Sequence, residues 1–222
     1  MTMLVTVLGA TGKTGALIVG ELLGRGATVR GAVRRPAALE EVRARGADAV
    51  LADLRAETEE LAEALAGSDV VINAAAASDP QPGLAEAVDR DGAINAVRAA
   101  QKAGITRFVQ VSSLFADRPD EGPEFLHRVL RAKQISDQAL VESGMGWTIL
   151  RPGGLTDDPG TGLVRLANRL DIAPGTPRTV PRADVAAVAA AALDEPSSLD
   201  RAFDLTSGDT PIADALAAPA GA

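Results

Sequence analysis

A glycine-rich turn near the amino terminus constrains this chain more than any other feature. Glycines at positions 9, 12 and 15 follow an apolar, β-branched run at 3–8, which predicts a buried strand. Residues 16–23 carry apolar side chains at helical spacing. In a strand–turn–helix frame, these glycines permit a tight turn, a close approach of backbone N–H groups to a diphosphate, and close helix–strand packing. Free N–H groups at the helix start also suit phosphate. We therefore expect a phosphate-binding site at Gly9, Thr11, Gly12, Lys13, Thr14 and Gly15.

Alternating strand-like and helix-like segments predict the fold. Strands are expected at 3–8, 28–33, 47–52, 70–73, 106–112, 147–151 and 202–205, and helices at 12–25, 37–45, 57–65, 84–103, 123–143, 183–194 and 212–217. This order predicts an α/β Rossmann-type fold, a doubly wound parallel sheet in three αβα layers, as a single domain over 1–222. The Pro- and Gly-rich stretch within 154–182 is the least regular. Together with the loop at 114–125, this stretch is expected to border the ligand crevice, and the alternative is an ordinary surface loop.

Composition excludes several classes of function. The 222 residues include no cysteine and one histidine, so we expect no disulfide, no thiolate chemistry and no metal site. A net charge of −8 argues against nucleic acid or an anionic membrane as partner. No signal peptide is expected, and the longest apolar run, 185–193, is far shorter than the ~20 residues that span a bilayer. A cytoplasmic protein with a small-molecule substrate is the expectation, and the oligomeric state stays open.

The end of the second predicted strand indicates which dinucleotide binds. An NAD-binding protein places an Asp or Glu there to accept hydrogen bonds from the ribose hydroxyls, whereas this chain continues with Arg34 and Arg35. A guanidinium cannot accept those bonds but suits the 2′-phosphate of NADP. We expect NADP(H) to be preferred over NAD(H), with Arg34 in direct contact and Arg35 as a neighbour or a bystander. Two merely exposed loop arginines are the alternative.

Residues after the third and fourth predicted strands complete this expected edge. Asp53 and Leu54 are placed to border the adenine, although Asp53 could equally cap a turn. Asn73, Ala74 and Ala75 end the fourth strand with small residues, which allow a flat ring to approach the backbone. We include all five among the expected cofactor contacts.

Four motifs together resemble a known family. They are Gly-Ala-Thr-Gly-Lys-Thr-Gly at 9–15, Val-Arg-Arg-Pro at 33–36, Val-Ser-Ser at 111–113 and Leu-Arg-Pro-Gly-Gly-Leu-Thr-Asp at 150–157. With them the chain resembles the atypical short-chain dehydrogenases/reductases, in the NAD(P)H-binding group of flavin reductase/biliverdin-IXβ reductase, NmrA-like sensors and sugar epimerase-like proteins. The resemblance implies a Rossmann fold, NADP(H) as ligand and a substrate pocket at the carboxyl edge of the sheet. It adds Ser112, Pro152 and Gly153 to the expected cofactor site.

The resemblance also implies two catalytic candidates. The wider family uses a serine near the fifth strand and a Tyr–Lys pair four residues apart, and Ser113 and Lys133 match the serine and the lysine. The tyrosine position holds Val129, and the chain has no tyrosine, which excludes Tyr-mediated proton transfer. Lys133 could anchor the nicotinamide ribose or pair with Asp137 one helical turn away. Ser113 could bind a substrate carbonyl or satisfy the backbone.

Other polar residues have simpler expected roles. His127 precedes Lys133 by roughly 240° of helical rotation, so a surface position is expected for it. Asp157 and Asp158 could hold a proton or a substrate hydroxyl, although a turn or cap role is favoured. Asp184 is expected at the start of a helix.

Three functions follow as hypotheses. The first is an NADP(H)-dependent oxidoreductase that passes hydride to a flavin, quinone or carbonyl acceptor. The second is a non-catalytic NADP(H)-binding redox sensor of the NmrA-like kind. The third, an NAD(P)-dependent sugar epimerase-like isomerase, is disfavoured because such chemistry normally uses a Tyr-like acid/base.

Overall fold

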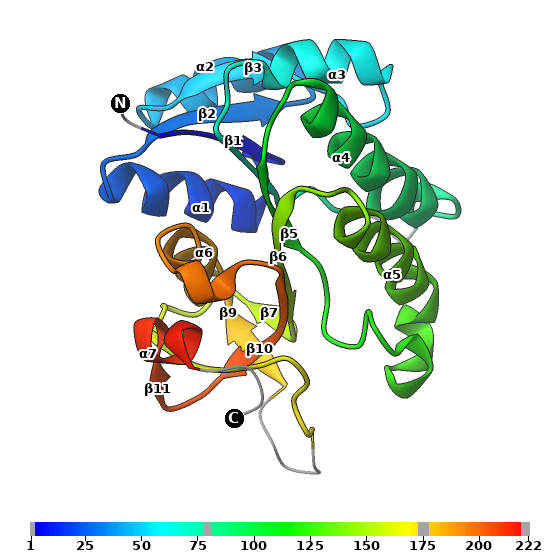
Figure 1. The fold of residues 1–222 in the computed structure, drawn as a ribbon, viewed down its shortest axis with the longest axis vertical. Coiled ribbons are helices and arrows are strands. Elements are labelled where there is room, and N and C mark those ends of the chain that lie inside the picture. Colours follow the sequence, from blue (N-terminus) through cyan, green and yellow to red (C-terminus); the bar gives the residue numbers. More distant parts are fainter. Residues whose placement is uncertain (1–2, 78–80, 173–177, 219–222) are drawn as a thin grey trace.

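The central sheet has the doubly wound order that the strand–helix alternation predicts. A computed structural model of the chain describes residues 3–77, 81–172 and 178–218. Within these ranges nine strands form one sheet in the order β11-β8-β10-β6-β5-β4-β1-β2-β3 (Figure 1). All neighbours from β3 to β10 are parallel, and β8 runs antiparallel to β10 and β11. The strands are β1 (Leu4–Leu8), β2 (Thr28–Val33), β3 (Asp48–Leu51), β4 (Val70–Asn73), β5 (Arg107–Val111), β6 (Gly146–Pro152), β8 (Leu163–Ala167), β10 (Arg201–Ser207) and β11 (Thr210–Pro211).

Strand order reverses between β1 and β4, and this places the glycine turn. Leu8, the last residue of β1, lies opposite Ala32 of β2 on one side and Asn73 of β4 on the other. In a doubly wound sheet, ligands bind outside the carboxyl ends of the strands at such a switch point. The turn that begins at Gly9 emerges there.

Helices cover both faces of the sheet, as Figure 1 shows. The first apolar core joins β1 and β2 to α1, α2 and α6, and the second joins the other face to α3, α4 and α5. Val70 and Ile72 belong to the first core and Val71 to the second, as expected for alternating side chains of a strand buried on both faces. The helices are α1 (Lys13–Gly24), α2 (Leu39–Ala44), α3 (Thr58–Leu65), α4 (Ala93–Lys102), α5 (His127–Val141), α6 (Arg182–Ala191) and α7 (Ile212–Ala217).

Two predicted segments differ from the structure. The stretch 154–182 is not an irregular loop throughout, because β7 (Gly154–Thr156) pairs with β9 (Thr179–Pro181) in a second sheet and β8 joins the main sheet. The Pro and Gly residues of this stretch gave no local strand signal, and the strands are stabilised by pairing with distant segments. Residues 173–177 of this stretch lie outside the described residues. The expected helix at 84–103 becomes regular only at Ala93, after a π-helical segment at Glu86–Gly92.

Candidate dinucleotide site at the switch point

Close backbone approaches require glycine at two positions of the turn, Gly9 and Gly15. Gly9 has φ +77°, and a Cβ there would lie 2.8 Å from the backbone of Ala75 at the end of β4. A Cβ on Gly15 would lie 2.1 Å from the carbonyl oxygen of Gly9. The N–H of Gly12 donates to that same carbonyl at 2.9 Å. The turn is therefore folded back on itself and pressed against β4, which leaves its outer side to the start of α1.

The start of α1 fits a phosphate group. Gly12 is the N-cap and has no side chain to cap the helix, and the first turn contains no acidic residue. Its first N–H groups therefore lack a capping side chain, and the helix dipole favours an anion beside them. Thr11 and Thr14 are half-buried, while Lys13 is exposed. The cradle of small residues and free donors fits a dinucleotide diphosphate.

Arg34 and Arg35 lie at the same sheet edge, just beyond β2. Both are exposed, and within the described residues neither side chain forms an ion pair or hydrogen bond. Asp53, beyond β3, is engaged by Arg55 with an Nη2–Oδ2 distance of 2.8 Å. That hydrogen bond, and to a smaller extent the charge of Arg34, lowers the pKa of Asp53. The Asp53 carboxylate thus holds a turn at Arg55, and Arg34 is left available beside it.

The residues after β4 and β3 differ in what they offer a ligand. Asn73 is buried, its amide nitrogen donates to Gln110 at 3.0 Å, and its oxygen accepts from the Ala75 N–H at 3.1 Å. Its side chain thereby shapes the strand end against the glycine turn. Ala74 and Ala75 are half-buried, whereas Leu54 belongs to the core. Cofactor contacts at these four positions stay predictions, and for Asn73 the side chain is already occupied.

The residues after β5 and β6 form the next part of the edge. The Ser112 hydroxyl is buried and donates to Asp137 Oδ2 at 2.9 Å. Ser113 is half-buried, and its hydroxyl donates to the neighbouring Leu114 carbonyl at 3.3 Å. A Cβ on Gly153 would lie 2.1 Å from the carbonyl oxygen of Arg178. Packing against the chain before β9 thus explains this glycine. Pro152 ends β6, and its carbonyl accepts from the Leu114 N–H at 2.8 Å.

Lys133 is buried and paired, but with a partner that the sequence did not suggest. Its Nζ lies 3.0 Å from Asp89 Oδ1, in the π-helical segment, and the two side chains are 8% and 1% exposed. Its Nζ also donates to the Val111 carbonyl at 3.4 Å. The alternative pairing with Asp137 is not among its ion pairs within the described residues. Asp89 is a site residue that the sequence reasoning missed, since nothing in its local sequence marks it as buried.

Asp137 extends this pair into a buried charge cluster. Its Oδ2 accepts from Ser112 and lies 3.3 Å from Arg151 Nε. Burial raises the pKa of Asp137 to about 6, against the opposing effects of Arg151, Ser112 and Lys133. This cluster includes Ser112, next to the family serine position Ser113, and the charge of Lys133, at the family lysine position, acts on Asp137.

Asp137 makes the stability of the protein depend on pH. Its folded-state pKa is above the unfolded value, so between about pH 4 and 6 the folded state keeps a proton that the unfolded state releases. The contribution of this group to the free energy of unfolding therefore falls as pH rises through that window, by about 2–3 kcal/mol. Asp137→Asn removes it. We expect denaturant titrations at about pH 4.5 and 7.5 to show that the free energy of unfolding of the wild type, relative to that of the variant, is larger at the lower pH.

A matched control is Asp158→Asn, which removes an exposed carboxylate. The difference between its free energy of unfolding and that of the wild type should be nearly the same at the two pH values. The same constancy for Asp137→Asn would contradict the assigned pKa shift.

Two cavities lie near the predicted substrate-side loops and α5. One of about 450 Å³ is lined from both loops, by Phe115, Arg118, Glu121, Arg169, Leu170, Asp171, Ile172 and Arg178. It adjoins the end of β6, because the Arg178 carbonyl accepts from the Gly154 N–H at 2.7 Å.

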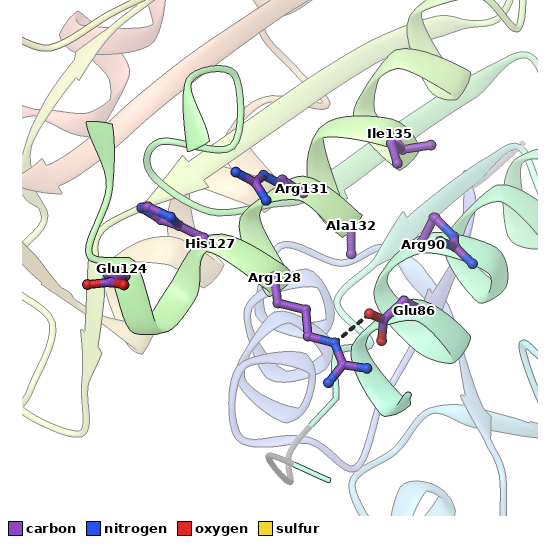
Figure 2. A pocket seen from close by; sticks show the side chains of 8 residues that line it. All are labelled: Glu86, Arg90, Glu124, His127, Arg128, Arg131, Ala132 and Ile135. Atoms are coloured by element: carbon purple, nitrogen blue, oxygen red, sulfur yellow. Dashed lines mark hydrogen bonds and ion pairs between the residues drawn. The ribbon is translucent and has the colours of Figure 1, made fainter. Parts of the chain in front are cut away.

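The other cavity, of about 470 Å³, lies between α5 and the π-helical segment (Figure 2). His127 lines it, half-buried, and Arg128 spans it to Glu86 with a Nε–Oε1 distance of 2.5 Å. None of the expected cofactor residues lines this cavity. Lys133 does not line this cavity.

Asp184 lies in the first turn of α6, as expected from the sequence. It is buried, and its carboxylate also accepts hydrogen bonds from the backbone N–H groups of Thr161 and Gly162. Asp157 forms ion pairs in place of a turn or cap bond.

Within the described part of the chain, no helix is both long and apolar enough to cross a membrane. In the same residues, no group of three or more Asp, Glu or His side chains is arranged to hold a metal ion.

Comparison with known proteins decides the family. The family model described as NAD(P)H-binding matches residues 9–196, from the first glycine of the turn to beyond α6. The chain belongs to the NAD(P)H-binding family. Within this family it is 41% identical to an uncharacterized sugar epimerase, YhfK of Bacillus subtilis, over 96% of this chain and 99% of that protein. It is 30% identical to an NAD(P)H azoreductase of Xenophilus azovorans, over 98% of this chain and 74% of the relative.

A solved structure supports the fold. A candidate NAD-dependent epimerase/dehydratase from Bacillus halodurans superposes with a TM-score of 0.89 at 35% identity, covering 96% of this chain and 98% of the other. The family match and this superposition confirm the predicted Rossmann-type fold and the nicotinamide dinucleotide as the class of ligand. Which residues contact the dinucleotide stays a prediction.

Proposed function

We propose that this chain is an NADP(H)-dependent reductase that passes hydride to a small organic acceptor of the flavin, quinone or carbonyl type. One observation carries the proposal: a glycine turn without room for a Cβ lies at the switch point, with unpaired Arg34 at the strand end where an NAD-binding protein has an acidic residue. The relative named NAD(P)H azoreductase supports a reductase.

In this proposal the nicotinamide supplies the hydride, and the protein supplies binding and orientation. The N–H groups at the start of α1 hold the diphosphate, and Arg34 binds the 2′-phosphate. Ser113 is the half-buried hydroxyl at the end of β5 that is placed to bind a polar group of the acceptor. The cavity lined by Phe115 and Arg178 is the proposed acceptor site, since it adjoins the carboxyl end of β6. With no tyrosine in the chain, the proton comes from another group or from solvent.

An acceptor screen tests the reductase assignment. The purified protein would be mixed with NADPH and, separately, with a flavin, a quinone, an azo dye and an aldehyde, and the loss of nicotinamide absorbance would be followed. Acceptor-dependent oxidation of NADPH is the expected result. Tight NADPH binding with no oxidation by any class would contradict the enzyme assignment.

Arg34→Ala should separate the two cofactors. A charge-assisted contact contributes about 1.5–3 kcal/mol, so NADPH affinity should fall by about 10- to 150-fold, while NADH affinity changes by less than about twofold. Parallel calorimetric titrations measure both. Arg35→Ala, which removes the adjacent exposed guanidinium, is the control and should weaken NADPH much less. Equal losses for both cofactors would show that Arg34 does not read the 2′-phosphate.

A second candidate is a non-catalytic NADP(H)-binding sensor. The specific observation in its favour is Val129 in the position of the family tyrosine, together with the burial of Lys133 in an ion pair. The acceptor screen separates the two candidates, because a sensor binds NADPH without oxidising it. The epimerase name of the Bacillus subtilis relative points to a third activity, which would convert a sugar with no net oxidation of the cofactor.

A further inference from the structure

A carboxylate lies between two cations at the mouth of the glycine turn. Asp157 Oδ2 is 2.6 Å from Lys13 Nζ, and Asp157 Oδ1 is 2.5 Å from Arg182 Nη1. Lys13 is the first residue of α1, Arg182 is the first residue of α6, and Asp157 directly follows β7. Three segments distant in sequence thus bring two positive charges and one negative charge to the helix start that fits a phosphate.

The position of Asp157 does not depend on these ion pairs alone. The segment that follows it is tied to α6 because Asp184 accepts hydrogen bonds from the Thr161 N–H at 3.0 Å and the Gly162 N–H at 2.8 Å. Asp184 is buried, whereas Asp157 and Lys13 are 61% and 70% exposed on their side chains. The carboxylate is therefore held close to the cations but open to exchange with a ligand from solvent.

We propose that Lys13 and Arg182 bind the diphosphate of the dinucleotide, and that Asp157 occupies these two cations until the dinucleotide displaces it. This inference rests on the proposed dinucleotide-binding function. An anionic diphosphate and the Asp157 carboxylate would compete for the same donors, since both are recognised by guanidinium and ammonium groups. Asp157 then sets the affinity for the cofactor without being needed to bind it.

The diphosphate, rather than the 2′-phosphate, is the group assigned to this pair. Lys13 belongs to the first turn of α1, whose N–H groups and dipole favour a phosphate. Arg34 lies at the end of β2, in the position that reads the ribose 2′ group. The diphosphate is common to NADH and NADPH, so both cofactors should respond to changes at Asp157.

Asp157→Asn is the test, with calorimetric titrations of NADPH, NADH and inorganic pyrophosphate. Since exposed ion pairs are weak, we expect all three to bind about two- to tenfold tighter than to the wild type. Arg182→Gln should weaken all three by about tenfold. In the Arg182→Gln background, Asp157→Asn should have a smaller effect, because one of the two cations it releases is gone.

Asp158→Asn is the matched control. It removes the same charge one residue away, from a carboxylate that forms no ion pair within the described part of the chain. Equal tightening by Asp157→Asn and Asp158→Asn, or no tightening by either, would overturn the inference and leave the proposed function standing. Tightening of NADPH alone would overturn the diphosphate assignment. A wild type that binds neither nucleotide would overturn the proposed function together with the inference.

Discussion

Replacement of Gly15 by alanine is expected to lower the free energy of unfolding by about 1–3 kcal/mol and to weaken NADPH binding tenfold or more. The added Cβ would lie 2.1 Å from the Gly9 carbonyl oxygen, and both groups are on the backbone, so no side-chain rotation relieves the contact. Alanine is the better helix former by about 1 kcal/mol, but this gain is smaller than the cost of opening the turn. Opening it moves Gly9 away from Ala75 and displaces the N–H groups at the start of α1.

Gly20→Ala is the matched control for this variant. Gly20 lies in the same helix, is exposed, and a Cβ there would meet nothing within 4 Å among the described residues. Alanine at this position should therefore stabilise the protein by about 0.5–1 kcal/mol and leave NADPH affinity unchanged. Thermal unfolding and an NADPH titration of both variants measure the contrast. Equal changes in thermal stability and in NADPH affinity for the two variants would contradict the close approach at Gly15.

Lys133→Met is expected to cost about 3–5 kcal/mol of stability. The change leaves the Asp89 carboxylate buried without its cation, and it removes one of the positive charges that face Asp137. Desolvation of an uncompensated charge exceeds the packing gained from methionine. Denaturant titration measures the loss. Lys102→Met is the control, because Lys102 pairs with Glu59 on the surface and should change stability by less than about 1 kcal/mol.

A double variant separates structural from cofactor-binding roles of Lys133. Asp89→Asn added to Lys133→Met removes the unpaired charge, and we expect it to recover more than half of the lost stability. NADPH binding by this refolded double variant then reports on the nicotinamide-ribose contact that the family resemblance implies. If the double variant is no more stable than Lys133→Met alone, the buried pair is not what stabilises this junction.

Sequence reasoning predicted the central fold because its signals are local. The apolar runs that became β1, β2, β4 and β5 are buried on both faces, and glycine turns or polar residues separate them from amphipathic helices. The short strands β7 and β9 were missed for the opposite reason. Each has three residues, and their pairing depends on Gly153 lying against the Arg178 backbone, which no local pattern reveals.

In the candidate site, too, features with a local sequence signal could be predicted, and contacts between distant segments could not. The turn that contains glycines 9, 12 and 15 could be located because it lies between a strand and a helix that local patterns predict. The contact of Arg34 with a 2′-phosphate stays a prediction. Partners distant in sequence could not be assigned. Asp89 meets Lys133 from another helix, and Asp157 reaches Lys13 across 144 residues of chain. Asp184 lies in the first turn of α6 as its sequence suggests, but its hydrogen bonds to Thr161 and Gly162 could not be assigned.

The most direct test of the account is a parallel titration of the cofactor-free wild-type protein with NADPH and NADH, by calorimetry or nicotinamide fluorescence. The glycine turn and Arg34 predict that both bind and that NADPH binds at least about tenfold more tightly. Equal affinities would contradict the reading of Arg34 as the 2′-phosphate contact. Binding of neither would contradict the proposed NADP(H)-dependent function itself.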